Sequence, residues 1–105
     1  MATPEGLVLA SICEYLALKG YFFSRTNNAP IFEKSRQVFR ALPKYTRKGW
    51  PDICLIHKGV FYGVEVKSEK GVLSPEQKLL GKEIEQNGGR YVVARSIKDV
   101  QAHGL

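Results

Sequence analysis

Cysteine is scarce in this chain of 105 residues, which contains only Cys13 and Cys54. They form no CxxC pair, so the sequence offers neither a disulfide framework nor a cysteine zinc site. No apolar run approaches the roughly 20 residues that cross a bilayer. The first residues carry no Lys or Arg before a short apolar stretch, unlike a secretory signal. We therefore expect a protein of the reducing cytoplasm that has no contact with a membrane.

Internal repeats and low-complexity segments are also absent from the sequence. Hydrophobic residues make up 44% and charged residues 25% of the chain, which is ordinary for a globular protein. This composition excludes disordered and collagen-like chains. Because a chain of this length supports one hydrophobic core, we expect residues 1–105 to form a single domain.

Acidic residues are outnumbered, with 10 Asp and Glu against 16 Lys and Arg, for a net charge of +6. Most of the excess falls in residues 27–50, which contain one acid, Glu33. The cations of this segment are Lys34, Arg36, Arg40, Lys44, Arg47 and Lys48. A local cationic patch is typical of a phosphate-binding surface. A solvated loop rich in Lys and Arg would have the same composition, and charge alone does not separate the two.

Three helices are expected from the sequence. Apolar residues at helical spacing predict the first over residues 4–19, with Thr3 as its N-cap. The second begins at a capping box, in which Ser74 and Gln77 bond each other's backbone amides, and Pro75 follows Ser74 directly. Ser96 is expected to cap a third, short helix.

Strand-forming residues lie between these helices. Two β-rich runs, residues 53–57 and 60–66, are separated by Lys58-Gly59, which predicts a hairpin. Further short strands are expected at residues 21–25, 37–42 and 91–94. Both faces of the 60–66 run are rather apolar, so we expect an α/β fold with a mixed central sheet flanked by helices.

The hairpin register brings three charged residues together. If His57 pairs with Val60, Asp52 lies opposite Glu65, and Lys67 points to the same face two residues later. Two opposed carboxylates repel each other unless a cation lies between them, and hard oxygen ligands suit Mg²⁺. A hairpin loop of three residues would abolish this arrangement.

Each of these residues also has an ordinary interpretation when it is taken alone. Glu65 and Lys67 could form an ion pair on an exposed strand, and Asp52 could be a turn residue after Pro51. Their coincidence on one face, beside a basic segment, favours a functional site.

Two motifs resemble those of a known nuclease family. GWPD at residues 49–52, followed by EVK at residues 65–67, resembles the PD-(D/E)xK motif. GVLSPEQ at residues 71–77 resembles the closing motif of its VRR-NUC (virus-type replication-repair nuclease) branch. The resemblance extends from Glu5 to the last expected helix and implies a restriction-endonuclease-like PD-(D/E)xK core.

This resemblance implies a Mg²⁺-dependent, structure-specific endonuclease that hydrolyses phosphodiester bonds in DNA, with Mn²⁺ as a second possible cofactor. Stand-alone members resemble phage and bacterial enzymes that cleave Holliday junctions as homodimers in the cytoplasm. Two alternatives stay open: a DNA-binding module that keeps the fold without cleaving, and a flap or nicking nuclease. RNA also stays open as a substrate.

The resemblance also implies residue roles. Asp52, Glu65 and the backbone carbonyl of Val66 would hold the Mg²⁺ ion. Lys67 would orient the attacking water or stabilise the charge that develops on the phosphate. Gln77 would lie near the catalytic lysine, although the capping box by itself accounts for a glutamine at this position.

A glutamate of the first helix is implied as a further metal ligand, and two residues compete for this role. Glu5 continues the apolar stripe of Leu9 and Ile12, whereas Glu14 lies on the opposite side of the helix. We therefore choose Glu5 as a catalytic and metal-binding residue, which would act as a direct ligand or through a bound water, and interpret Glu14 as solvated surface. The alternative, which we favour less, is that Glu5 is a first-turn acid stabilised by the helix dipole.

Contacts with nucleic acid are expected from the basic segment and from the turn before the second helix. The expected phosphate-binding residues are Arg36, Arg40, Lys44, Arg47, Lys48, Ser68 and Lys70. The aromatic residues among these cations are Phe32, Phe39, Tyr45 and Trp50. They could stack on exposed bases, but aromatic residues in a long loop more often pin it to the core, and Trp50 is the expected anchor.

Overall fold

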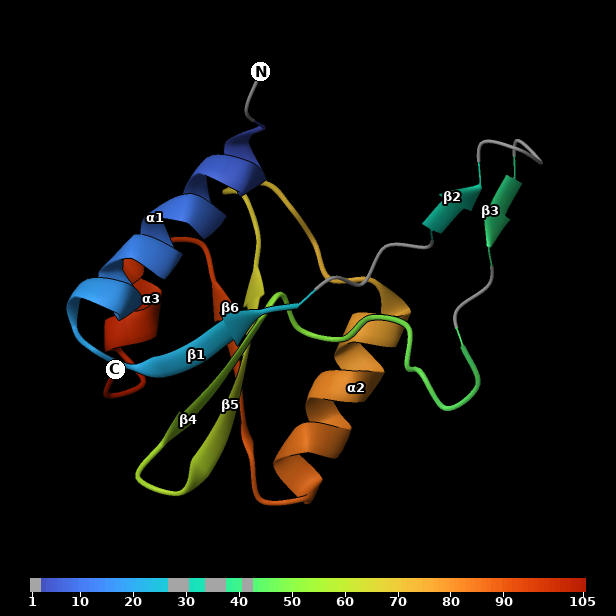
Figure 1. Cartoon of the computed structure of the whole chain (residues 1–105). Helices are drawn as coiled ribbons and strands as arrows, with labels where there is room; N and C mark the ends of the chain where they lie inside the picture. The colour runs from blue at the N-terminus through green and yellow to red at the C-terminus, as the bar shows by residue number, and fades with distance from the viewer. Residues whose placement is uncertain (1–2, 27–30, 34–37, 41–42) are drawn as a thin grey trace.

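A mixed four-stranded sheet forms the centre of the molecule. The computed structural model describes residues 3–26, 31–33, 38–40 and 43–105. The sheet is ordered β1 (Phe22–Arg25), β4 (Ile53–His57), β5 (Val60–Val66) and β6 (Arg90–Ala94), as Figure 1 shows. The pairs β1–β4 and β4–β5 are antiparallel, whereas β6 runs parallel to β5. This architecture confirms the predicted α/β fold with a mixed central sheet.

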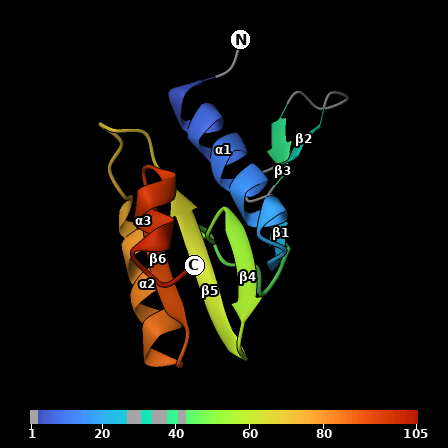
Figure 2. The same ribbon diagram turned by 90° about the vertical axis from the view of Figure 1, so that its left-hand side faces the viewer.

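Helices cover both faces of the sheet, as predicted. Helices α1 (Pro4–Leu18) and α3 (Ile97–Gln101) lie on one face, and α2 (Pro75–Gln86) lies on the other (Figures 1 and 2). The core between the sheet, α1 and α3 consists of Ile12, Leu16, Ile53, Leu55, Val64, Val66, Val92, Ala94, Val100 and Leu105. Because this face is filled by apolar side chains, polar chemistry is confined to the α2 face.

The turn between β4 and β5 sets the register that the site requires. Lys58 and Gly59 both adopt positive φ, 52° and 79°, as a two-residue turn matched to the strand twist demands. His57 therefore pairs with Val60, and the ladder continues to Ile53 opposite Val64. The predicted register is confirmed.

One strand differs from the sequence-based expectations. The segment Ile31–Glu33 forms a strand, β2, that was not expected, and it pairs with β3 (Val38–Arg40) in a separate two-stranded sheet. Strand β3 lies within the strand expected over residues 37–42, of which residues 37, 41 and 42 lie outside the described residues. A run of three residues is too short to show a clear alternation of polar and apolar side chains, which explains why β2 was missed.

Capping was predicted correctly for two helices and wrongly for the third. The side chains of Thr3 and Ser74 accept hydrogen bonds from Gly6 N (3.0 Å) and Gln77 N (3.2 Å). Ser96 occupies the N-cap position of α3, but its side chain makes no capping bond. The carboxylate of Asp99 instead accepts a hydrogen bond from the backbone of Arg95, 2.8 Å away.

Candidate active site

Two carboxylates meet where β4 begins and β5 ends. The position before Ile53 is Asp52 and the position after Val64 is Glu65, so the β4–β5 ladder directs both to the α2 face. Glu65 is buried, with 2% of its surface exposed, and Asp52 is half-buried. Oδ2 of Asp52 accepts a hydrogen bond from the backbone nitrogen of Val66 at 2.8 Å.

The chemistry of Glu65 follows from this burial. Burial and, to a smaller extent, the neighbouring charge of Asp52 raise the pKa of Glu65 to about 8, although Lys67 acts in the opposite direction. At neutral pH the carboxyl of Glu65 therefore holds a proton in the absence of a cation. Its Oε1 atom is buried and has no hydrogen-bond partner in the described part of the chain.

Lys67 approaches the same carboxyl. Its Nζ atom lies 3.7 Å from Oε2 of Glu65, and only 11% of the lysine side chain is exposed. The backbone nitrogen of Lys67 donates to Ala94 O on β6 at 3.0 Å, which extends the sheet past the end of β5. Both the backbone and the ammonium group of Lys67 are thus fixed beside the carboxylates.

Gln77 takes part both in the helix cap and in a hydrogen bond to Glu65. Its Oε1 atom accepts a hydrogen bond from Ser74 N at 2.9 Å, and its backbone nitrogen donates to the Ser74 hydroxyl, so the predicted capping box is present. Its Nε2 atom donates to Oε2 of Glu65 at 3.1 Å. The two interpretations of Gln77 are therefore compatible, because the cap orients the amide that reaches Glu65.

Thr26 holds the segment before β4 in place, a role that no sequence pattern indicates. Its backbone nitrogen donates to Asp52 O at 2.9 Å, and its hydroxyl donates to the carbonyl of Pro51. Both bonds join the end of β1 to the residues that carry the first carboxylate. A threonine after a short strand is common in proteins, so only the fold reveals its contacts.

A match to a known protein family identifies the class of protein that carries this site. The family model of the VRR-NUC domain matches residues 8–98, most of the 105 residues of the chain. The chain belongs to the VRR-NUC family. It is therefore a nuclease of the virus-type replication-repair class, with a PD-(D/E)xK-like core and DNA as its substrate. The comparisons with curated proteins and with solved structures found no match.

The VRR-NUC match includes Asp52, Glu65, Lys67 and Gln77 but begins after Glu5. Glu5 is exposed in the first turn of α1, and its charge adds a small upward effect to the pKa of Glu65. Figure 1 shows the start of α1 near the end of β5. Glu14 is exposed, as expected.

The donor set of this VRR-NUC site fits a hard divalent cation. Two carboxylates on one sheet face, one with an unused buried oxygen, offer oxygen ligands of the kind that Mg²⁺ prefers. Within the described ranges, no three His, Cys, Asp or Glu side chains gather as a metal-binding group. A cation would thus be held by the two carboxylates with help from the backbone, and water or phosphate oxygens would complete its coordination.

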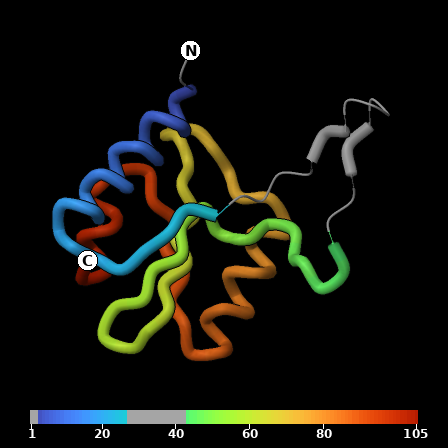
Figure 3. Tube along the Cα trace, in the orientation of Figure 1, coloured from blue at the N-terminus to red at the C-terminus, as the bar shows by residue number. Residues whose placement is uncertain are grey.

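The end of the basic segment, residues 47–49, lies against α2. Gly49 has a φ of 86° and approaches α2 so closely that an added Cβ would lie 3.0 Å from Gln77 N. Figure 3 shows the segment after residue 42 running beside the start of α2. Arg47 forms an ion pair with Glu83, and Lys48 lies 3.5 Å from Glu76. Two expected phosphate-binding cations are therefore already paired with α2 carboxylates.

The structure describes some of the remaining expected phosphate-binding residues but not all of them. Lys44 lies over the ring of Tyr45, 5.1 Å from its centroid, and both residues are exposed. Lys70 is exposed and Ser68 is half-buried. Arg36 and the side chain of Arg40 lie outside the described residues, as do the side chains of Phe32 and Phe39.

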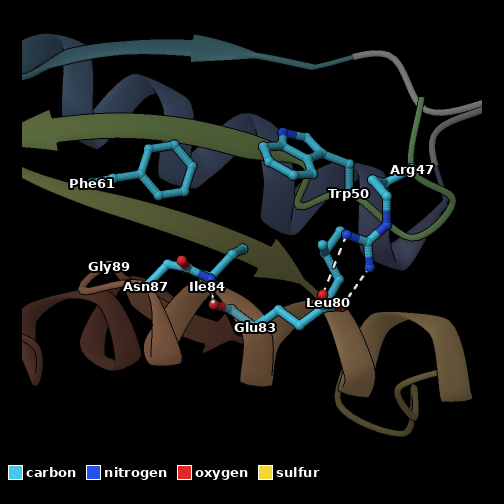
Figure 4. Close-up of a pocket in the computed structure, with 8 residues that line it drawn as sticks. All are labelled: Arg47, Trp50, Phe61, Leu80, Glu83, Ile84, Asn87 and Gly89. Carbon is cyan, nitrogen blue, oxygen red and sulfur yellow. Dashed lines mark hydrogen bonds and ion pairs between the residues drawn. The ribbon is translucent and has the colours of Figure 1, made fainter. Parts of the chain in front are cut away.

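Trp50 anchors the loop, as expected. Its indole Nε1 donates to Cys54 Sγ at 3.2 Å, and its ring centroid lies 6.3 Å from that of Phe61. These two rings line a cavity of about 360 Å³ above α2 (Figure 4). The remaining lining residues are Arg47, Leu80, Glu83, Ile84, Asn87 and Gly89. Tyr45 is 89% exposed, so the expectation that the loop aromatics act as anchors is wrong for this residue.

Arg95 supports the turn that joins β5 to α2, a role that was not predicted from the sequence. Its Nη1 atom donates to the carbonyl oxygens of Ser68 (2.6 Å), Glu69 (3.3 Å) and Gly71 (2.7 Å). These bonds fix the turn that carries the half-buried Ser68 and the exposed Lys70. An arginine after the last strand has no pattern that would have identified this role.

No helix in the described part of the chain is long and apolar enough to span a membrane.

Proposed function

We propose that this VRR-NUC nuclease is a Mg²⁺-dependent, structure-specific DNA endonuclease that cleaves Holliday junctions or other branched DNA as a homodimer. The observation that supports it best is the convergence of Asp52, Glu65 and Lys67 at one point, with Gln77 on the same carboxyl. A protein that only binds DNA gains nothing from two opposed carboxylates, which makes a non-cleaving module the weaker alternative. Mn²⁺ has the same ligand preference and is the expected substitute.

In this proposal, Asp52, Glu65 and the backbone carbonyl of Val66 hold the ion, and Glu5 contributes from α1 through a bound water. When bound, Mg²⁺ polarises the phosphate and makes water nucleophilic at neutral pH. Lys67 orients that water or stabilises the charge that develops on phosphorus. Water adds to phosphorus, one phosphorus–oxygen ester bond breaks, and a proton passes to the leaving alcohol. Gln77 fixes the Glu65 carboxyl, and the expected phosphate-binding residues hold the flanking DNA.

Cleavage of labelled DNA tests the proposal directly. A four-way junction, a flap and a linear duplex are incubated with the protein and Mg²⁺, and the products are resolved on a gel. The junction should be cut fastest, and Asp52→Asn should reduce cleavage to background, because the amide keeps an acceptor for Val66 N but lacks the charge. Glu14→Gln on the exposed side of α1 is the matched control and should cut normally.

A near wild-type rate for Asp52→Asn would contradict the metal site. Binding of the junction without any cleavage in Mg²⁺ or Mn²⁺ would favour the non-cleaving module, and preferred cutting of the flap would favour the flap or nicking nuclease.

Homodimer formation follows from the geometry of the substrate. A four-way junction is resolved by two symmetrical nicks, and one 105-residue domain carries one ExK motif. A twofold dimer supplies two sites related by the symmetry of the junction, and it is the commonest oligomer. Light scattering at micromolar concentration should give twice the chain mass of 11.8 kDa. A stable monomer with and without junction DNA would contradict this part of the proposal.

A further inference from the structure

Tyr91 carries a buried hydroxyl on the same sheet face as Glu65. It lies on β6 opposite Gly63 of β5, and Glu65 lies opposite Val93, so Tyr91 and Glu65 are both directed toward α2. Its ring is wedged against Gly81 of α2, where an added Cβ would lie only 2.5 Å from the tyrosine Cδ2 atom. The ring is thus held between the sheet and the helix, and its hydroxyl has little freedom to move.

Two polar atoms of this region are buried and have no hydrogen-bond partner in the described ranges. They are the hydroxyl of Tyr91, which can donate, and Oε1 of Glu65, which can accept. Buried polar atoms are rarely left without a partner, because they lose the bonds that water would give them. Burial raises the pKa of Tyr91, and the charges of Glu65 and Asp52 raise it further.

The other oxygen of the Glu65 carboxyl is already fixed. Oε2 accepts a hydrogen bond from Gln77 Nε2 at 3.1 Å and faces Lys67 Nζ at 3.7 Å. Oε1 has no hydrogen-bond partner within the described residues, although the Asp52 carboxyl is near enough to raise the pKa of Glu65. A single water between Oε1 and the Tyr91 hydroxyl would satisfy both atoms, and polar sites of this kind are where proteins hold internal water.

We propose that Tyr91 is a positioning residue of the active site, whose hydroxyl holds the Glu65 carboxyl through one bound water. The inference rests on the proposed metal site, because its consequence is that Glu65 is preset in the orientation that receives the cation. Hydrogen bonds to a metal ligand of this kind fix its direction and commonly change metal affinity by about 10- to 100-fold. A carboxylate oxygen has two lone pairs, so Oε1 can accept this bond and still face a cation.

Tyr91→Phe tests the inference, because it removes the hydroxyl and keeps the ring against Gly81. Titration calorimetry should show Mg²⁺ binding about tenfold weaker than wild type, whereas DNA binding measured without metal should not change. Tyr62→Phe is the matched control. It lies on β5 and packs against the core on the opposite sheet face, and its Mg²⁺ affinity should be that of wild type. Equal Mg²⁺ affinity for Tyr91→Phe and wild type would overturn the inference.

A second measurement needs neither metal nor DNA. Wild type, Tyr91→Phe, Glu65→Gln and the double variant are unfolded in urea with a chelator present, as a double-mutant cycle. A water-mediated bond predicts that the effects of the two changes on stability are not additive, whereas additive effects would overturn the inference. The cycle decides the role of Tyr91 even if wild type cuts no DNA, an outcome that would count against the proposed function alone.

Discussion

The backbone nitrogen of Val66 donates a hydrogen bond to Oδ2 of Asp52 over 2.8 Å. This contact lies just beyond the last rung of the β4–β5 ladder, where Ile53 faces Val64. The carboxylate therefore ties the end of β5 to the segment before β4 through one of its two oxygens. Because Asp52 has both a structural and a proposed chemical role, asparagine separates the two roles more cleanly than alanine does.

The two roles of Gln77 can be separated by two substitutions. Ser74→Ala removes a helix cap and should cost about 1 kcal/mol of stability with little change in cleavage. Gln77→Glu keeps a residue suited to the capping box but replaces the donor to Glu65 with an acceptor. Its stability should stay closer to wild type than that of Ser74→Ala, whereas cleavage should fall by about tenfold or more. Urea unfolding and cleavage rates of both variants provide the measurement, and equal cleavage by both would show that the Glu65 contact has no catalytic value.

The metal-free protein is expected to lose stability as pH rises from about 5 to about 9. The pKa of Glu65 is about 8 in the folded state, above its ordinary value of 4.5. Between these values the folded state retains a proton that the unfolded state has released, so stability falls with rising pH. Each pKa unit corresponds to about 1.4 kcal/mol, and the loss should amount to several kcal/mol.

Urea unfolding across this pH range in the presence of a chelator measures this loss. Glu65→Gln is the matched control, because its side chain does not ionise, and the difference between the two curves isolates Glu65. Curves that run parallel would show that Glu65 is ionised throughout the range.

Arg47 and Lys48 should contribute to DNA affinity despite their ion pairs with Glu83 and Glu76. Exposed ion pairs contribute little to stability, so DNA phosphates can displace the carboxylates at small cost. Replacing both cations with alanine should lower the slope of log affinity against log salt by about 2, since each phosphate contact contributes about 0.9.

Fluorescence anisotropy with junction DNA at several salt concentrations measures that slope. The exposed cations Lys58, in the β4–β5 turn, and Lys98, on α3, provide a control double variant. If the Arg47 and Lys48 variant keeps the wild-type slope, the phosphates follow another path across the protein.

Local sequence patterns were sufficient to predict the geometry of the two carboxylates. The Lys58-Gly59 turn fixes the hairpin register, because both residues adopt the positive φ of a two-residue turn and no distant contact is needed. The capping box of Ser74 and Gln77 likewise depends on groups three residues apart. Interactions between near neighbours in sequence leave a readable pattern, so the opposed carboxylates could be predicted from the sequence alone.

The contacts between the strands and α2 could not be predicted from the sequence, because they depend on how the elements pack. Gln77 reaches Glu65 because α2 packs on the sheet, and Arg95 holds a turn more than twenty residues before it in the chain. The raised pKa of Glu65 depends on burial, which is a property of the assembled layers. None of these features has a periodicity or spacing of its own, because each depends on the distance between elements that the chain brings together only when its hydrophobic core forms.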